Sequence, residues 1–356
     1  MLLSKQLDAI SKEAESISSA PEFSSYRAHA LEVVAKLKGK LSSALASRSR
    51  EVRDSNLFQV EIGIIWLSRE RGHIRLAQAS LSDARFTALS NATTFYSKRI
   101  GLGVTPLPFF SEHYFSTGSF SYYREPVALR LSNDHYVLSA AYVDEPFFWP
   151  LIVHEIAHCW LSKRDDVDQL TSKWVDRCGL DRDNMMSRVE EAICDVVASR
   201  LIGPSYPLAF INKFWSRFPI PGVVSPDYPT NRFRLECMAS SLDAQFFTEE
   251  AAEIREIADA KFIDTWREEE ISPALSDICA VATTFPSLTV SEIRRLGNGP
   301  LESVALSSAN AVAALFYGAW ISIDRLGQDM NDTIAQISKI LVRKLEGSAV
   351  SSNSQA

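Results

Sequence analysis

The feature that most constrains the fold is an almost entirely apolar segment, residues 151–160, that contains two histidines and a glutamate. A helix that is apolar all round belongs inside a core. Pro150 precedes the segment and suits the first turn of a helix, where its missing N–H leaves no bond unmade. We therefore predict a buried helix that begins near residue 150 and carries ionisable side chains into the interior.

The ionisable residues of this segment, His154, Glu155 and His158, form the pattern HExxH. Residues at i and i+4 share one helix face, so both imidazoles can meet one ion, while Glu155 lies beside it and can accept a proton from water. The alternative is a pair of structural histidines beside a hydrogen-bonded glutamate. Because such burial is costly unless the groups are bonded or coordinated, we favour a metal site, with Zn²⁺ as the ion.

A catalytic zinc site needs a third protein ligand. No histidine follows His158, so a carboxylate from a second apolar helix, predicted at residues 185–202, is expected. Glu191 and Asp195 lie four residues apart and share a face. One can bind the metal while the other accepts the free ring N–H of a ligand histidine. Glu190 competes with Glu191 for the ligand role, and we prefer Glu191 because it shares the face of Asp195.

The chain resembles a known class of enzymes in three motifs: HEIAH at 154–158, EEAICD at 190–195, and Tyr228-Pro229 followed by Arg234-Leu235. These motifs are similar to those of the gluzincin zinc metallopeptidases and, within that class, of the CAAX prenyl endopeptidases and their soluble bacterial relatives. The resemblance covers about residues 120–240. It implies a zincin-like core in which strands pack on the HExxH helix. It also implies that His154, His158 and Glu191 bind zinc and that Glu155 is the general base and acid. Asp195 would orient the first histidine, and Arg234 would lie near the active site.

Two positions depart from that family. Tyr228 stands where the family has a histidine that stabilises the oxyanion, and a tyrosine hydroxyl can donate a similar hydrogen bond. Cys194 replaces the small residue before the aspartate. We expect Tyr228 or Arg234 to stabilise the oxyanion. The GxMEN motif of related exopeptidases is absent, which favours an endopeptidase.

The rest of the chain predicts a mainly α protein with a small β element. Apolar residues recur at helical spacing before residue 100, strand patterns cover 127–132 and 136–142, and helical patterns resume after a proline-rich loop. Four regions are predicted. They are an N-terminal helical region (1–100), a zincin-like core (101–245), a C-terminal helical region (246–346) and a disordered tail (347–356).

Charge and cysteine usage narrow the class of protein. The net charge of −7 argues against a nucleic-acid partner, which would require a positive face. Five cysteines without a Cys-x-x-Cys arrangement fit reduced thiols, and the N-terminal residues lack a secretory h-region, so we expect a cytoplasmic protein. The uncharged stretch 303–323 contains several polar residues, so we expect a buried helix and no membrane partner.

The expected activity is hydrolysis of peptide bonds in a protein or peptide substrate. An extended substrate is expected to pair with an edge strand, either 127–132 or 136–142. One alternative is a catalytically weak or inactive zincin-like protein, whose helical flanks bind a regulatory protein partner. Another is hydrolysis of a non-peptide amide by the same groups.

Overall fold

The computed structural model describes the chain in eleven ranges: 2–19, 21–103, 105–110, 116–119, 136–140, 145–162, 164–178, 182–215, 229–261, 275–324 and 330–347. It is mainly helical, as the sequence predicts. The α-helices in chain order are α1 (Leu2–Glu15), α2 (Pro21–Ala46), α3 (Arg50–Ala79), α4 (Ala84–Arg99), α5 (Leu151–Leu161), α6 (Asp166–Cys178), α7 (Arg182–Ile202), α8 (Ser205–Trp215), α9 (Asn231–Asp243), α10 (Thr248–Lys261), α11 (Leu275–Ala282), α12 (Val290–Gly297), α13 (Ala309–Asp324) and α14 (Met330–Gly347).

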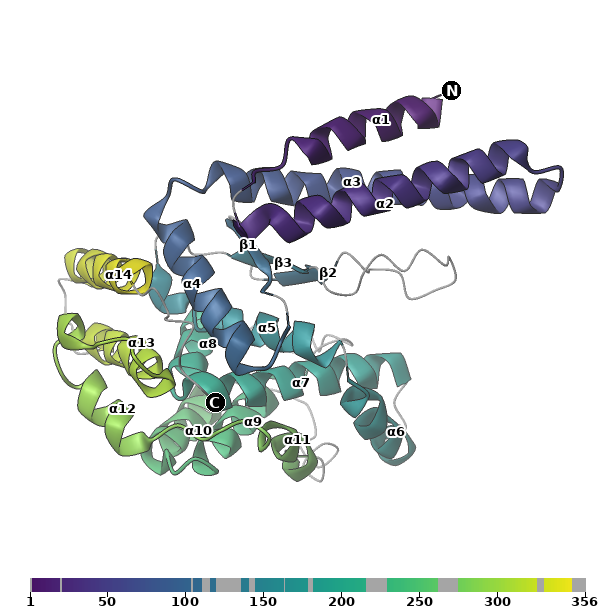
Figure 1. Ribbon diagram of the computed structural model, residues 1–356. Coiled ribbons are helices and arrows are strands. Elements are labelled where there is room, and N and C mark those ends of the chain that lie inside the picture. Colours follow the sequence, from purple (N-terminus) through teal and green to yellow (C-terminus); the bar gives the residue numbers. More distant parts are fainter. Residues whose placement is uncertain are drawn as a thin grey trace.

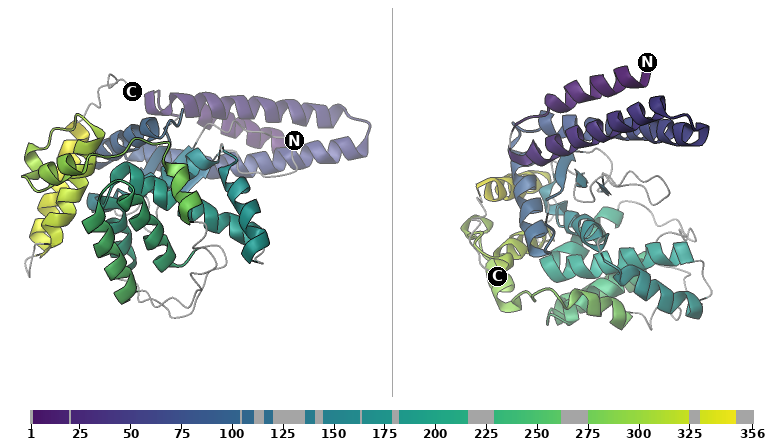
Figure 2. Two further views of the ribbon diagram at one scale, coloured as in Figure 1. Left: turned by 90° about the horizontal axis from the view of Figure 1, so that it is seen from below. Right: turned by 45° about the vertical axis from the view of Figure 1, so that its right-hand side comes forward.

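The helices form two groups with a small sheet between them (Figure 1). Helices α1, α2 and α3 pack on one another and form an arm on one side of the molecule. The right-hand view of Figure 2 shows the same arm facing the body that contains α7, α9 and α10. Helix α4 links the two groups, because it contacts α5 and α14 and its Phe86 belongs to the hydrophobic core of the arm.

The sheet has three short strands in the order β1-β3-β2 within the described residues: β1 (Leu107–Phe110), β2 (Ser116–Ser119) and β3 (Tyr136–Ala140). Strand β3 runs parallel to β1, with Leu107 opposite Val137, and antiparallel to β2. It confirms the strand expected at 136–142, whereas the strand expected at 127–132 lies outside the described residues. Strands β2 and β3 both lie against α5.

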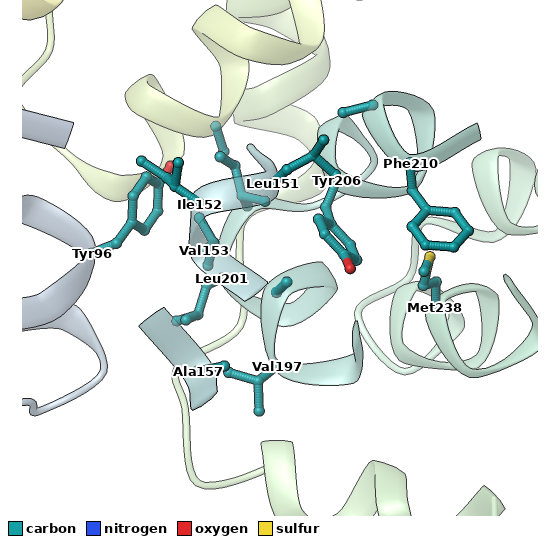
Figure 3. Close-up of a cluster of buried hydrophobic side chains, with 14 of the residues drawn as sticks. Tyr96, Leu151, Ile152, Val153, Ala157, Val197, Leu201, Tyr206, Phe210 and Met238 are labelled. Atoms are coloured by element: carbon teal, nitrogen blue, oxygen red, sulfur yellow. The ribbon is translucent and has the colours of Figure 1, made fainter. Parts of the chain in front are cut away.

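The main core surrounds α5 and α7, which pack directly against each other. On α5, Val153, Ile156 and Ala157 have no exposed surface. Figure 3 shows Val153 and Ala157 near Val197 and Leu201 of α7. Full burial of each valine or isoleucine side chain contributes about 1.5–3 kcal/mol. The predicted helix near residue 150 is confirmed, and the interface with α7 fixes the position of its ionisable side chains.

The arm has a hydrophobic core of its own, formed mainly by α1, α2 and α3. The main core extends along the chain from Ala88 of α4 to Leu345 of α14. Its members include both the predicted zincin-like region and the predicted C-terminal helical region. Helix α4 contributes to both cores, with Phe86 in the core of the arm and Ala88 in the main core. The predicted tail lies outside the described residues beyond 347.

Helix α13 accounts for most of the uncharged stretch 303–323. Its residues Ala313, Ala314, Leu315 and Ala319 are fully buried in the main core, so the predicted buried helix is confirmed. Within the described ranges, no helix combines the length and the apolarity that crossing a membrane would require.

Candidate metal centre

The two histidines of HExxH project from α5 toward one point. His154 and His158 lie one helical turn apart, and their Nε2 atoms are 3.2 Å from each other. His154 is only 6% exposed, while His158 is partly exposed. Because His158 is the more exposed of the two histidines, solvent would reach the site from its side. The i, i+4 spacing therefore produces the convergence that the sequence predicts.

Glu191 completes the group from the facing helix α7. Its Oε2 atom lies 3.3 Å from Nε2 of His154, and its Oε1 atom lies 3.3 Å from Nε2 of His158. One ligand atom from each of these three residues lies within 4.8 Å of the others. Two imidazole nitrogens and a carboxylate oxygen are the donor set of catalytic zinc sites, so the three residues fit Zn²⁺.

Carboxylates also hold the back of each imidazole. Nδ1 of His154 lies 3.0 Å from Oδ1 of Asp195, and Nδ1 of His158 lies 2.9 Å from Oε1 of Glu190. With Nδ1–H donated to a carboxylate, each ring keeps the lone pair of Nε2 for an ion. Glu190 and Glu191 thus occupy different sides of the histidine pair, and the geometry favours Glu191 as the ligand.

Asp195 is the most heavily bonded residue behind the site, and it is fully buried. The Tyr206 hydroxyl donates to its Oδ1 atom at 2.5 Å and lies 3.0 Å from Nδ1 of His154. Arg234 donates to both carboxylate oxygens, from Nε at 2.6 Å and from Nη2 at 2.8 Å. The same Nη2 atom lies 3.1 Å from Glu191. Each charge in this buried network therefore has a partner, as burial requires.

The residues behind the histidines lie on three helices, α7, α8 and α9. Asp195 follows Glu191 by one turn of α7, and Tyr206 opens α8 just after a turn at Gly203. Gly203 adopts φ +67°, and a Cβ there would approach Leu288 to 3.2 Å, so glycine suits this reversal. Arg234 lies on α9, where its guanidinium also covers the ring of Phe210 at 4.7 Å. Figure 3 shows Tyr206 and Phe210 together on α8.

The histidines bear raised pKa values. For His154, burial acts to lower the pKa, but the hydrogen bonds to Asp195 and Glu191 outweigh it. For His158, burial also acts downward, while Cys194, Glu190 and Glu191 raise the pKa well above its ordinary value. The surrounding carboxylates thus favour positive charge at this position. A divalent cation would take that place by displacing protons.

The acidic residues are held in their charged forms. Burial acts to raise the pKa of Glu191, but Arg234 and the histidines bring it well below the ordinary value. The pKa of Asp195 is also lowered, because Arg234 and His154 outweigh its burial. Carboxylates that stay ionised are ready to hold a cation or a cationic ring.

Glu155, the predicted general base, lies on α5 between the two histidines in sequence. Its side chain is partly exposed, and within the described part of the chain it makes no hydrogen bond or ion pair. Glu190, Glu191 and Asp195, by contrast, all contact the histidines. A carboxylate without a fixed partner suits proton transfer.

Of the two residues expected to stabilise an oxyanion, the structure describes one. Tyr228 lies outside the described residues. Arg234 is present behind the site, 7% exposed, with its guanidinium bound to Asp195 and Glu191. These contacts favour a positioning role for Arg234 over direct contact with a substrate.

Three neighbours of the histidines have contacts that the sequence patterns do not predict. Tyr206 carries no motif of its own, although its place just after Gly203-Pro204 is a visible helix-start signal. Glu190, the competing candidate for the third ligand, contacts Nδ1 of His158. Cys194, which replaces the small residue of the family, is fully buried, its charge interacts with that of His158, and burial raises its pKa to about 12. Its spacing of four residues from Glu190 indicates the shared face.

No protein-family profile matches the chain, and comparisons with curated proteins and with solved structures likewise found no significant match.

Proposed function

We propose that the protein is a zinc metallopeptidase, with a zincin-like core in which His154, His158 and Glu191 hold the ion. The observation that carries the proposal is the approach of both oxygens of Glu191 to the paired Nε2 atoms, at 3.3 Å each. Two further features support it. Strands β2 and β3 lie against the HExxH helix, and both rings are anchored through Nδ1 by carboxylates.

When bound, Zn²⁺ would supply Lewis-acid activation of a water molecule and of a substrate carbonyl. Glu155 accepts the proton of the attacking water and returns it to the leaving amine, so one side chain serves as base and then as acid. Asp195 and Glu190 keep the imidazoles oriented through this cycle. Arg234 and Tyr206 keep Asp195 charged and in place.

An extended peptide is proposed to pair with an edge of the sheet. The expectation that residues 136–142 supply that edge was wrong, because β3 has β1 on one side and β2 on the other. Within the described residues, β2 is the edge that lies against α5. A peptide aligned along β2 would gain backbone hydrogen bonds next to the histidine pair.

The test is the substitution Glu155→Gln in zinc-loaded protein, assayed on casein and a peptide library. The expected result is an unchanged zinc content with cleavage reduced on the order of 10²–10⁴-fold. Asp165→Asn, which removes an exposed carboxylate just beyond α5, is the matched control and should cleave like wild type. Wild-type-like turnover by Glu155→Gln would refute the proposed mechanism.

A regulatory protein with a metal site is the second candidate. The arm of α1, α2 and α3 favours it, because an arm with its own core can present a surface to a partner independently of the site. Zinc binding without cleavage in the same library assay would support this candidate. Release of amine from a non-peptide amide, identified by product analysis, would instead indicate a hydrolase of that class.

A further inference from the structure

Two arginines from different helices converge on one turn, away from the metal centre. Arg99 is the last residue of α4, and its Nη2 donates to the carbonyl oxygen of Pro286 at 3.3 Å. Arg200, in the last turn of α7, donates from Nε to the carbonyl oxygen of Phe285 at 3.1 Å. The two carbonyls belong to consecutive residues, so both guanidinium groups bind the same turn, and the charge of Arg200 acts on Arg99.

Neither arginine has an acidic partner in the part of the chain that the structure describes. The salt bridges there involve other arginines, including Arg182, Arg232, Arg255 and Arg294. Burial lowers the pKa of Arg99, and the charge of Arg200 lowers it further. Burial also lowers the pKa of Arg200. Two neighbouring positive charges, both partly withdrawn from water, are unfavourable without an anion.

Donors at this position also lack partners. Among the residues that the structure describes, the Nε atom of Arg99 is buried and has no hydrogen-bond partner. The same holds for the hydroxyl of Tyr96, which lies one helical turn earlier on α4 and is 1% exposed. Burial raises the pKa of Tyr96 and the charge of Arg99 opposes this, so the two groups are neighbours. Buried donors are normally satisfied, so these two indicate a missing acceptor.

We propose that Arg99 and Arg200 form a binding site for a phosphate-type oxyanion, either free phosphate or the phosphate group of a small monoester. Guanidinium groups present planar, paired N–H donors that match the oxygens of phosphate. Both side chains are partly exposed, so an anion can reach them from solvent. The site is separate from the metal centre, because Arg200 follows Glu191 by about 13 Å along α7.

A purely structural role is the competing explanation. Arginines in the last turns of α4 and α7 complement the negative ends of those helices and hold the turn at Phe285. That role requires no ligand. It predicts that changing either arginine affects stability alone, with no difference between phosphate and chloride buffers.

The experiment titrates inorganic phosphate into the full chain by calorimetry, at constant ionic strength with chloride as the reference. The expected result is one phosphate per chain and a melting temperature that rises with phosphate concentration. Arg99→Gln and Arg200→Gln should each weaken binding at least about tenfold, since each removes charge-assisted hydrogen bonds. Lys98→Gln, a change of the exposed neighbour of Arg99, is the matched control and should bind like wild type.

Three further measurements distinguish a phosphate site from a purely structural role of the arginines. His158→Ala should still bind phosphate, which excludes binding at a metal ion. O-phosphoserine in place of inorganic phosphate shows whether the site accepts a monoester. If a glutamine variant unfolds, Arg200→Lys keeps the charge, and it should fold and bind more weakly than wild type. No phosphate binding by the wild type, or equal binding by wild type and both folded arginine variants, would overturn the proposal.

Discussion

Arg234 holds both carboxylate oxygens of Asp195, with Nε at 2.6 Å from Oδ2 and Nη2 at 2.8 Å from Oδ1. Both side chains are buried, and Asp195 in turn binds Nδ1 of His154. The pair therefore links α9 to α7 and to the first histidine of the metal centre. Its geometry explains how a fully buried aspartate stays charged behind that histidine.

Arg234→Gln is predicted to destabilise the protein by about 3–5 kcal/mol, because it leaves a buried carboxylate without its main partner. Equilibrium urea unfolding measures the change. Arg232→Gln on the same helix is the control. Arg232 pairs with Asp259 at 2.7 Å, but both side chains are exposed, so its loss should cost no more than about 1 kcal/mol. Equal losses of unfolding free energy in the two variants would show that the buried Arg234–Asp195 pair contributes no more to stability than an exposed pair.

Tyr206→Phe is predicted to weaken zinc binding roughly tenfold while preserving the fold. The substitution keeps the ring and removes the hydroxyl that donates to Asp195, so His154 loses part of its orientation. Competition with a chromogenic chelator measures the affinity. Tyr317→Phe removes a hydroxyl of α13 that donates to Glu250 of α10, and it should leave the zinc affinity unchanged. An unaltered affinity in Tyr206→Phe would show that the hydroxyl has no positioning role.

The adjacent residues Glu190 and Glu191 provide a direct comparison of ligand and supporting carboxylate. Glu191→Gln should abolish stoichiometric zinc binding, because its oxygens face the Nε2 atoms of both histidines. Glu190→Gln should lower the affinity about 10–100-fold, since Glu190 bonds to Nδ1 of His158 and not to the Nε2 atom that faces the ion. The same chelator competition ranks the two variants. The reverse order would assign the ligand role to Glu190.

A separate prediction concerns acid stability in the C-terminal helices. Arg294 donates to both oxygens of Glu250, at 2.9 and 2.7 Å, and Tyr317 donates at 3.0 Å. Burial acts to raise the pKa of Glu250, but these bonds bring it below the ordinary value of 4.5. Because the folded pKa is depressed, the ionised carboxylate stabilises the fold above about pH 4.5. That stabilisation is lost as the pH falls from there through the folded pKa.

Glu250→Gln should therefore cost about 1–3 kcal/mol at neutral pH and progressively less below pH 4.5, measured by urea unfolding across a pH series. Glu249→Gln is the matched control. Glu249 also contacts Arg294, at 3.1 Å, but its side chain is 80% exposed, so its removal should have little effect at any pH. A pH-independent difference between wild type and Glu250→Gln would contradict this account.

Local patterns in the sequence predicted the helices and the first elements of the site. The apolar run at 151–160 and the i, i+4 spacing of His154 and His158 suffice to place two imidazoles on one buried face. The same spacing in α7 places Glu191 and Asp195 on one face. These predictions depend on residues within two helical turns, where periodicity determines which side chains are neighbours.

Contacts between distant elements were not predictable in the same way. Tyr206 reaches His154 because a turn at Gly203 brings α8 back against α5, and no local pattern encodes that direction. Leu107 pairs with Val137 in the sheet, and β1 and β2 are too short to produce a period of two. The engagement of Arg234 by Asp195 likewise depends on how α9 packs on α7, which only the tertiary structure shows.

The most direct test of the central claim is the metal content of the purified chain, measured by inductively coupled plasma mass spectrometry after zinc loading and desalting. The account predicts one zinc per wild-type chain and none retained by His158→Ala. Cys159→Ala, a change of the buried neighbour on α5, should retain one zinc and so exclude general damage to the helix. A wild-type chain without zinc, or a His158→Ala variant that retains it, would contradict the proposed site.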